Sequence, residues 1–185
     1  GKGPCVNVQS ELTAYNFAGD YTAWFYNGEN HNIGPEKLTE TDGTRLPVMT
    51  VKAGDKHYMA IHEACLETGA PLVLQSKGGE SLFSVASKPT SLSPGYTSAW
   101  RVVLYGTTPG VLTDSHLLEL LNPDPDSRYD FSWVKPGLAV WDWRINGAVW
   151  DGFTYGMSYP SWVRMVDFAA EQGFKYLVLD ANWYG

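Results

Sequence analysis

Two short apolar runs in the last third of the chain end in acidic and indole side chains. The first run ends in Trp141, Asp142 and Trp143, and the second leads to Asp180 and Trp183. A sugar offers hydroxyl groups that bind carboxylates and an apolar C–H face that stacks on an aromatic ring. The pattern therefore predicts that these five residues bind a carbohydrate. Two alternatives stay open, because a strand-end acid can instead accept backbone N–H groups and a tryptophan can simply pack in a core.

Glu63 is a further acidic candidate, in the run Tyr58-Met-Ala-Ile-His-Glu-Ala64. Taken alone, this residue reads as a solvated strand acid. One carboxylate cannot specify a metal, since Ca²⁺ takes six to eight oxygen ligands and the chain has no Asp-rich loop. The sequence also lacks a Gly-x-Ser-x-Gly elbow, a His-Glu-x-x-His pair, a Walker loop and a dinucleotide glycine motif. Hydrolysis through carboxylates is the chemistry most compatible with what is left.

Charge and composition exclude several classes of partner. The net charge is −7 and no cluster of Lys and Arg occurs, which argues against nucleic acid. No apolar run is long enough to span a membrane, and residues 1–10 lack the regions of a signal peptide.

The eight tryptophans favour sugar stacking, although Trp133, Trp150 and Trp162 could equally pack in a core or between domains. Cys5 and Cys65 give no disulfide framework, so we expect two unpaired thiols.

The first half of the chain is predicted to be mainly β. Runs rich in β-branched and aromatic residues alternate with turn residues from position 11 to about 106, as in an antiparallel sandwich or barrel. The predicted strands are 46–52, 57–64, 71–75, 81–86 and 98–105.

A domain boundary is predicted at a polar segment that follows this β region. Residues 113–121 suit either a short helix capped by Thr113 or Asp114 or a buried strand. Residues 122–130 are polar and carry two prolines, which is typical of a linker. The sequence therefore predicts one domain over 1–130 and the beginning of another over 131–185.

The pattern after the linker is that of a parallel βαβ unit. Residues 137–143 and 174–180 are apolar runs of the kind buried in parallel sheets. Between them, a helix is predicted to begin after Ser158, with Pro160 in its first turn, and to end at Gly173. Parallel sheets are covered on both faces, so we expect a further polypeptide, the remainder of the same barrel, to complete this unit.

Seven short motifs stand out along the chain. In order they are Tyr21-Thr-Ala-Trp24, Ile61-His-Glu-Ala64, Ser98-Ala-Trp-Arg101, Ser132-Trp-Val-Lys-Pro-Gly137, Trp141-Asp-Trp143, Asp167-Phe-Ala-Ala170 and Leu177-Val-Leu-Asp180. This series resembles glycoside hydrolase family 97 from about residue 20 to the end of the chain. Ser-Trp-Val-Lys-Pro-Gly followed by Trp-Asp-Trp is its most specific part.

The resemblance implies a fold and a metal. Members of that family join a β-super-sandwich of the galactose-mutarotase-like kind to a (β/α)8 TIM barrel and a C-terminal β domain. The chain would then be mainly β, with the sandwich over 1–130, room for a further N-terminal part, and the first βαβ unit of a truncated barrel over 131–185. In such enzymes the sandwich lends one glutamate to an active-site Ca²⁺, and Glu63 matches that position.

The resemblance also implies an activity. Family members are exo-acting glycosidases that remove α-linked glucose or galactose from oligosaccharides, usually in the bacterial periplasm or after secretion. Their remaining calcium ligands and catalytic carboxylates lie on later barrel strands, beyond residue 185. No catalytic residue is therefore assigned here, and the isolated chain is predicted to be inactive.

Two departures from the family pattern leave the sugar open. Arg144 follows Trp-Asp-Trp where members often carry tryptophan, and Ala181-Asn182 follows Asp180 where members often carry Glu-Gly. A non-catalytic carbohydrate-binding or scaffolding β-sandwich is the alternative function. Such a module has no reason to carry a βαβ unit, which favours the enzyme.

Overall fold

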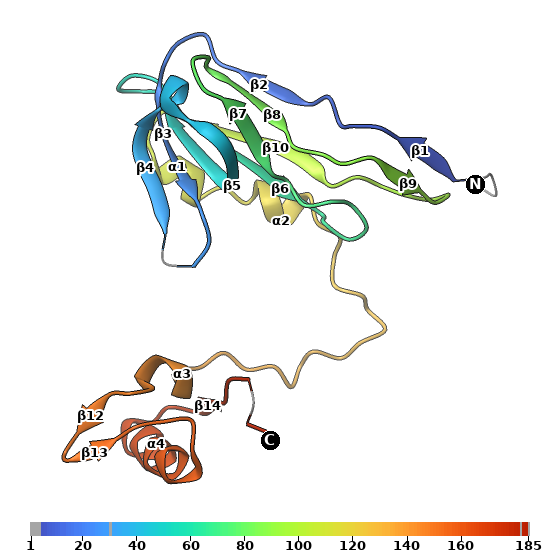
Figure 1. The fold of residues 1–185 in the computed structure, drawn as a ribbon. Helices are drawn as coiled ribbons and strands as arrows, with labels where there is room; N and C mark the ends of the chain where they lie inside the picture. The colour runs from blue at the N-terminus through green and yellow to red at the C-terminus, as the bar shows by residue number, and fades with distance from the viewer. Residues whose placement is uncertain (1–4, 30, 182, 185) are drawn as a thin grey trace. The chain divides into compact units, whose positions relative to one another are not determined.

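A computed structural model describes residues 5–29, 31–181 and 183–184 of the chain. The chain divides into two compact units, residues 1–125 and 126–185, and each is described by itself. The division falls between Pro125 and Asp126, inside the polar segment 122–130 that the sequence marks as a linker. Figure 1 shows the first unit as a curled arrangement of strands and the second as a smaller mixture of helices and strands.

The first unit consists mostly of antiparallel strands. Its elements in chain order are β1 (Val6–Val8), β2 (Ala14–Asn16), β3 (Thr22–Tyr26), β4 (Asn32–Lys37), the 3-10 turn η1 (Leu38–Glu40), β5 (Asp42–Lys52), β6 (Tyr58–Ala64), β7 (Leu74–Lys77), β8 (Leu82–Val85), β9 (Thr90–Leu92), β10 (Trp100–Gly106), α1 (Gly110–Thr113) and α2 (Leu117–Leu120). The mainly β fold predicted from the turn spacing is therefore present.

One long strand, β5, holds the main sheet of this unit together. Its first residues, Asp42 to Arg45, pair with β7, while Met49 to Lys52 pair with β6. The opposite edge of β5 pairs with β3, which in turn pairs with β4. Among the described residues, eight strands form this sheet, in the order β10-β6-β5-β7-β8-β2 with β3 and β4 beside β5. Strands β1 and β9 form a separate pair at one end of the unit (Figure 1).

The curl of the sheet encloses an apolar core. Most of its residues lie on β3, β5, β6, β7 and β8, where successive side chains point to opposite faces. Leu38 in η1 and Leu72, just before β7, complete it. The buried members are Ala23, Phe25, Leu38, Met49, Val51, Ile61, Leu72, Leu74, Phe83 and Val85. The other face of β6 and β10 is covered by a second cluster, in which residues from α1 and α2 pack on Ala60, Ala64, Val102 and Leu104.

Residues 113–121, which the sequence left open between helix and strand, form neither a strand nor one helix. They contain the end of α1 and the one-turn helix α2. The N-cap prediction was wrong, because Thr113 closes α1 and His116 occupies the N-cap of α2. A first turn begins earlier than predicted, after Pro109, whose fixed φ suits a helix start.

The second unit contains a parallel βαβ arrangement. Its elements are β11 (Ala139–Trp141), α3 (Asp142–Ile145), β12 (Val149–Trp150), β13 (Phe153–Thr154), α4 (Tyr159–Gln172) and β14 (Tyr176–Val178). Strands β11 and β14 pair in parallel, with Val140 opposite Leu177. Helix α4 has Ser158 at its N-cap and ends at Gly173 in the left-handed conformation, so the predicted helix is confirmed.

Four predicted strands need correction in their bounds. The run 46–52 is only the second part of β5, which begins at Asp42. The run 137–143 is extended only over β11, because the backbone turns into α3 at Asp142. The run 174–180 is a strand only over β14. The run 71–75 is displaced along the chain, since β7 begins at Leu74, where pairing with β5 and β8 starts.

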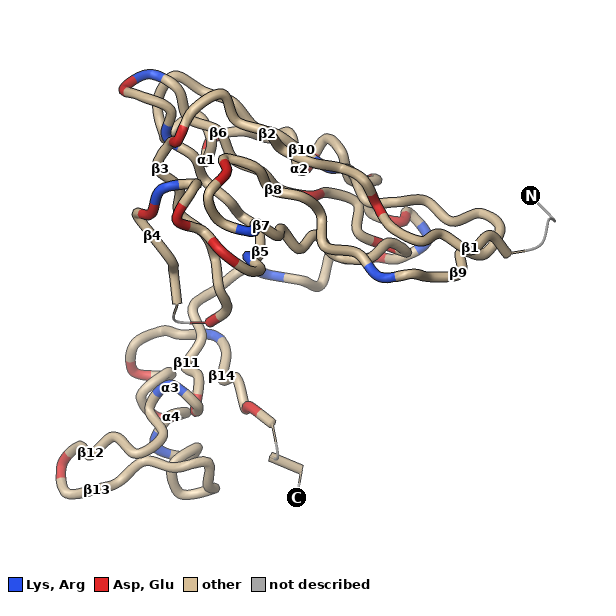
Figure 2. Tube along the Cα trace, turned by 45° about the horizontal axis from the view of Figure 1, so that its top comes forward, with Lys and Arg blue, Asp and Glu red and all other residues tan. Residues whose placement is uncertain are grey.

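Charged side chains are distributed over both units. Figure 2 shows Lys and Arg interspersed with Asp and Glu along the trace. Within the residues that the structure describes, no helix is both long and apolar enough to cross a membrane. Cys5 and Cys65 are both free cysteines in the structure.

Candidate functional site

The first candidate group, around Glu63, lies on adjacent strands of the main sheet. Glu63 on β6 stands directly opposite Arg101 on β10. Arg101 Nη1 donates to Glu63 Oε2 at 3.0 Å, and the backbone N–H of Leu72 donates to the same oxygen at 2.7 Å. The Glu63 side chain is only 11% exposed. Glu63 is therefore a nearly buried, paired carboxylate rather than the solvated strand acid that the sequence suggests on its own.

Arg101 joins Glu63 to a second acid, Glu11. Its Nε donates to Glu11 Oε1 at 2.9 Å and its Nη2 to Glu11 Oε2 at 2.7 Å, which makes a two-point pair. The Arg101 side chain is 15% exposed, so this triad sits largely out of water. Sequence reasoning missed both Arg101 and Glu11 as members of the group. Arg101 does end the motif Ser98-Ala-Trp-Arg101, but nothing in the sequence places it or Glu11 beside Glu63.

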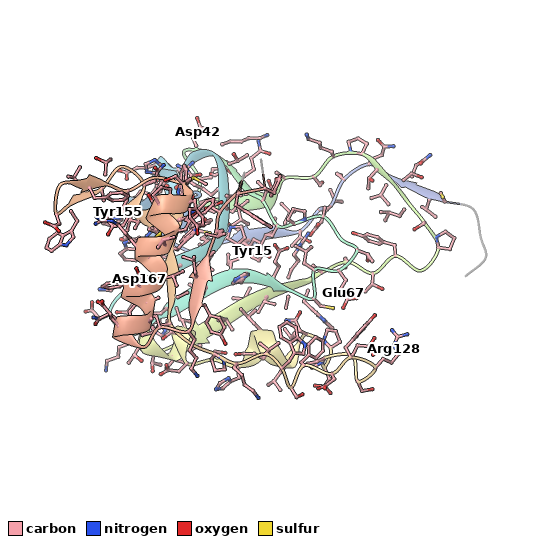
Figure 3. The ribbon with its side chains drawn as sticks, turned by 90° about the horizontal axis from the view of Figure 1, so that it is seen from below. Tyr15, Asp42, Glu67, Arg128, Tyr155 and Asp167 are labelled. Carbon is pink, nitrogen blue, oxygen red and sulfur yellow. The ribbon has the colours of Figure 1, made fainter. Side chains whose placement is uncertain are left out.

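The hydroxyl of Tyr15 lies beside the same triad. Tyr15 is on β2 (labelled in Figure 3), and the charges of Arg101, Glu11 and Glu63 all act on its hydroxyl group. Burial raises the pKa of Tyr15. Among the described residues the hydroxyl has no hydrogen-bond partner, although it is buried. Buried polar atoms normally have one, so this oxygen marks a place for a water molecule or another polar group.

A carboxylate oxygen is the ligand type that Ca²⁺ prefers, and Glu63 has one to offer. Oε2 already accepts two hydrogen bonds, whereas no described residue donates to Oε1. The described part of the chain holds no group of three or more His, Cys, Asp and Glu side chains placed to hold a metal. Glu63 thus fits the role of a single calcium ligand, and the other ligands would have to come from elsewhere.

The second candidate group lies where β11 and β14 end. Asp142 is fully buried and accepts two hydrogen bonds, from Trp162 Nε1 to Oδ2 at 2.9 Å and from the Asp180 backbone N–H to Oδ1 at 3.0 Å. Asp180 in turn accepts from Trp141 Nε1 at 3.0 Å and from the Ala181 N–H at 2.6 Å. The strand ends are therefore tied together by alternating carboxylates and indoles.

The five residues predicted to bind a sugar occupy different environments. Trp143 and Trp183 are 51% and 56% exposed, so their rings are accessible for stacking. Trp141 is partly buried, with the Arg144 guanidinium 5.0 Å from its ring centre. Asp142 has the contacts expected of a structural strand-end acid, the alternative that the sequence left open. Sugar binding by these residues stays a prediction.

Glu11 should make the stability of the first unit depend on pH. The hydrogen bonds from Arg101 hold the pKa of Glu11 below its ordinary value of 4.5. A carboxyl whose pKa is lowered by folding stabilises the protein above its unfolded-state pKa, and loses this contribution as the pH falls through the folded-state value. We expect Glu11→Gln to cost roughly 1 kcal/mol at pH 7, after solvent screening, and much less near pH 2.

Urea unfolding of the chain at several pH values measures this difference. The exposed Glu67→Gln substitution is the control, and it should change the free energy of unfolding little at any pH. A cost of Glu11→Gln that is the same at pH 7 and pH 2 would contradict the prediction.

An antiparallel β unit joined to a parallel βαβ unit with acids and indoles at its strand ends is typical of a carbohydrate-active enzyme. Comparison with known proteins narrows this class. Residues 2–123 match the family model described as Glycosyl-hydrolase 97 N-terminal, and the chain belongs to that family.

Two curated relatives share 28% identity with the chain. One is named a retaining alpha-galactosidase, from Bacteroides thetaiotaomicron, and the match covers 89% of the chain and 29% of the relative. The other is named a probable retaining alpha-galactosidase, from Streptomyces bingchenggensis, with 96% of the chain and 28% of the relative covered. The chain therefore spans less than a third of the length of these relatives.

Solved structures confirm the fold. A glycoside hydrolase family 97 enzyme from Pseudoalteromonas sp. strain K8, in complex with acarbose, superposes with a TM-score of 0.74 at 23% identity over 98% of the chain and 30% of that enzyme. The same enzyme has been solved with panose. A beta-arabinopyranosidase gives the same TM-score at 19% identity, over 99% of the chain and 32% of its own length.

Proposed function

We propose that the chain is the N-terminal part of an exo-acting glycoside hydrolase that cleaves α-galactosidic or α-glucosidic linkages. The observation that carries this proposal is the parallel unit β11-α4-β14 directly after the family 97 domain. A binding module has no use for such a unit, whereas a (β/α)8 barrel begins with one. The names of the two curated relatives favour an α-galactoside and a retaining mechanism.

In this proposal the ends of β11 and β14 form one side of the sugar site. Exposed Trp143 and Trp183 stack on the apolar faces of sugar rings, while Asp180 presents its carboxylate oxygens to hydroxyls. Trp141 holds that carboxylate in place through the hydrogen bond from its Nε1. Asp142 holds Asp180 in place, because its Oδ1 accepts the Asp180 N–H while its Oδ2 binds Trp162. The remainder of the barrel supplies the two carboxylates that a glycosidase needs.

The proposed cofactor is Ca²⁺, held in part by Glu63 Oε1. A bound calcium ion would orient the substrate and stabilise negative charge that develops in the reaction. The contribution of this chain is to hold one carboxylate oxygen at a fixed place on β6. The proposed setting is the bacterial periplasm or the cell exterior, as for the family that the motifs resemble.

The test is hydrolysis of aryl α-galactoside and aryl α-glucoside by the complete protein that carries this chain. We expect turnover of one of them, preferably the galactoside, that falls when EDTA removes calcium. Binding of α-linked oligosaccharides without turnover, in protein shown to be folded and of full length, would instead favour the carbohydrate-binding alternative. The exposed indoles of Trp143 and Trp183 are the feature that such a binding function would use.

A further inference from the structure

Arg101 uses all three of its nitrogen atoms in the buried triad. Nε and Nη2 are committed to Glu11, so the guanidinium plane is fixed by two parallel hydrogen bonds. The third nitrogen, Nη1, then points at Glu63 Oε2. This two-point pairing leaves little rotational freedom in the side chains of Arg101 and Glu11, because the guanidinium is planar and its donors have fixed directions.

This arrangement distinguishes the two oxygens of Glu63. Oε2 accepts from Arg101 Nη1 on strand β10 and from the Leu72 N–H in the connection between β6 and β7. A cation could contact Oε2 only by displacing one of them. Oε1 receives no hydrogen bond from any described residue, so it is the oxygen left for a metal ion.

Glu11 also balances the charge beside Glu63. A lone guanidinium 3.0 Å from Glu63 would cancel the charge that attracts a cation. Because Arg101 is paired equally closely with Glu11, the triad keeps a net charge of −1. The pairing therefore fixes the orientation of Glu63 without removing its attraction for a divalent cation.

We propose that Arg101, anchored by Glu11, is a positioning residue that makes Glu63 a one-oxygen ligand of a divalent cation through Oε1. This inference rests on the proposed function, which assigns Glu63 to calcium. Loss of a residue that orients a metal ligand typically weakens metal binding by about 10- to 100-fold. The orientation of Glu63, not only its presence, would then set the affinity of the site.

The experiment measures Ca²⁺ affinity of the complete protein by calorimetry, and Tb³⁺ luminescence lifetime in the same site. Arg101→Lys keeps the positive charge but loses the planar guanidinium that pairs with Glu11 at two points, so we expect the Ca²⁺ affinity to fall at least about 10-fold. The Tb³⁺ lifetime should shorten as water replaces the Glu63 oxygen. The matched control is Arg45→Lys, because Arg45 is equally buried and pairs with Glu36, outside the triad.

Each outcome decides between the proposals. Equal affinities and lifetimes for Arg101→Lys and Arg45→Lys, in a protein where Glu63→Gln does weaken binding, would overturn the positioning role alone. Unchanged Ca²⁺ affinity in Glu63→Gln would overturn the calcium role of Glu63 and the positioning role with it. If Arg101→Lys does not fold, Glu11→Gln replaces it, since freeing the guanidinium should also lower the affinity; no change there overturns the positioning role.

Discussion

The isolated 185-residue chain is expected to leave aryl α-galactosides and aryl α-glucosides intact, at a rate at least about 10⁵-fold below that of the complete enzyme. Glycoside hydrolysis needs two carboxylates on opposite sides of the scissile bond, and loss of both removes most of an enzyme's acceleration. Two of the candidate acids of this chain already have internal partners. Asp142 is buried with both oxygens bonded, and Glu63 is clamped by Arg101. Release of 4-nitrophenol at high protein concentration provides the measurement.

A contaminating glycosidase is the main source of a false positive in that assay. The control is a chain carrying Asp180→Asn, prepared identically, because activity that persists in it does not arise at the predicted sugar site. Hydrolysis by the unaltered chain that disappears in this variant would contradict the prediction. Addition of the remaining barrel polypeptide should restore turnover if the two pieces associate.

Features that depend on neighbouring residues were predictable from the sequence. The helix α4 was delimited by Ser158 and Gly173, whose roles as N-cap and left-handed C-terminal residue need no tertiary contact. The strand β6 followed from a short run that contains Tyr58 and Ile61 and comes shortly after the turn residues Gly54-Asp55. The polar segment 122–130 was visible from composition alone, and the limit between the two compact units, Pro125 to Asp126, lies within it, five residues before the predicted boundary at 130.

Features that depend on strand register were not predictable. Arg101 and Glu63 are 38 positions apart, and they meet only because β10 pairs with β6 in one particular register. Glu11 reaches Arg101 across 90 positions. Alternation within each strand shows which side chains share a face, but a one-residue slip would separate the pair. The long connection between β6 and β10 leaves the register open in the sequence.

Asp142 shows how the sequence can single out a residue without showing its contacts. Its place after an apolar run marked it as a strand-end acid, and the structure places it one residue beyond β11, at the start of α3. The sequence could not show which group donates to its Oδ2, because that donor, Trp162, lies 20 positions along the chain, on α4. Because Asp142 is fully buried, it can act on a sugar only through the residues that it holds.

Asp142→Asn is expected to destabilise the second unit by about 3 kcal/mol. The asparagine amide nitrogen would face either Trp162 Nε1–H or the Asp180 N–H, so that one buried donor loses its acceptor and meets another donor. Six of the eight tryptophans lie in residues 131–185, and only Trp24 and Trp100 lie outside this range. Urea unfolding followed by tryptophan fluorescence therefore reports mainly on this unit.

The exposed Asp167→Asn substitution on α4 (labelled in Figure 3) is the matched control, and it should change stability by less than about 0.5 kcal/mol. The same pair of variants separates the two roles of Asp142. If Asp142 touches the sugar directly, Asp142→Asn should weaken sugar binding while the unfolding midpoint stays at that of Asp167→Asn. If Asp142 instead holds Asp180 and Trp162 in place, as its burial and hydrogen bonds indicate, the unfolding midpoint of Asp142→Asn must lie below that of Asp167→Asn. Any loss of sugar binding would then result from that loss of structure.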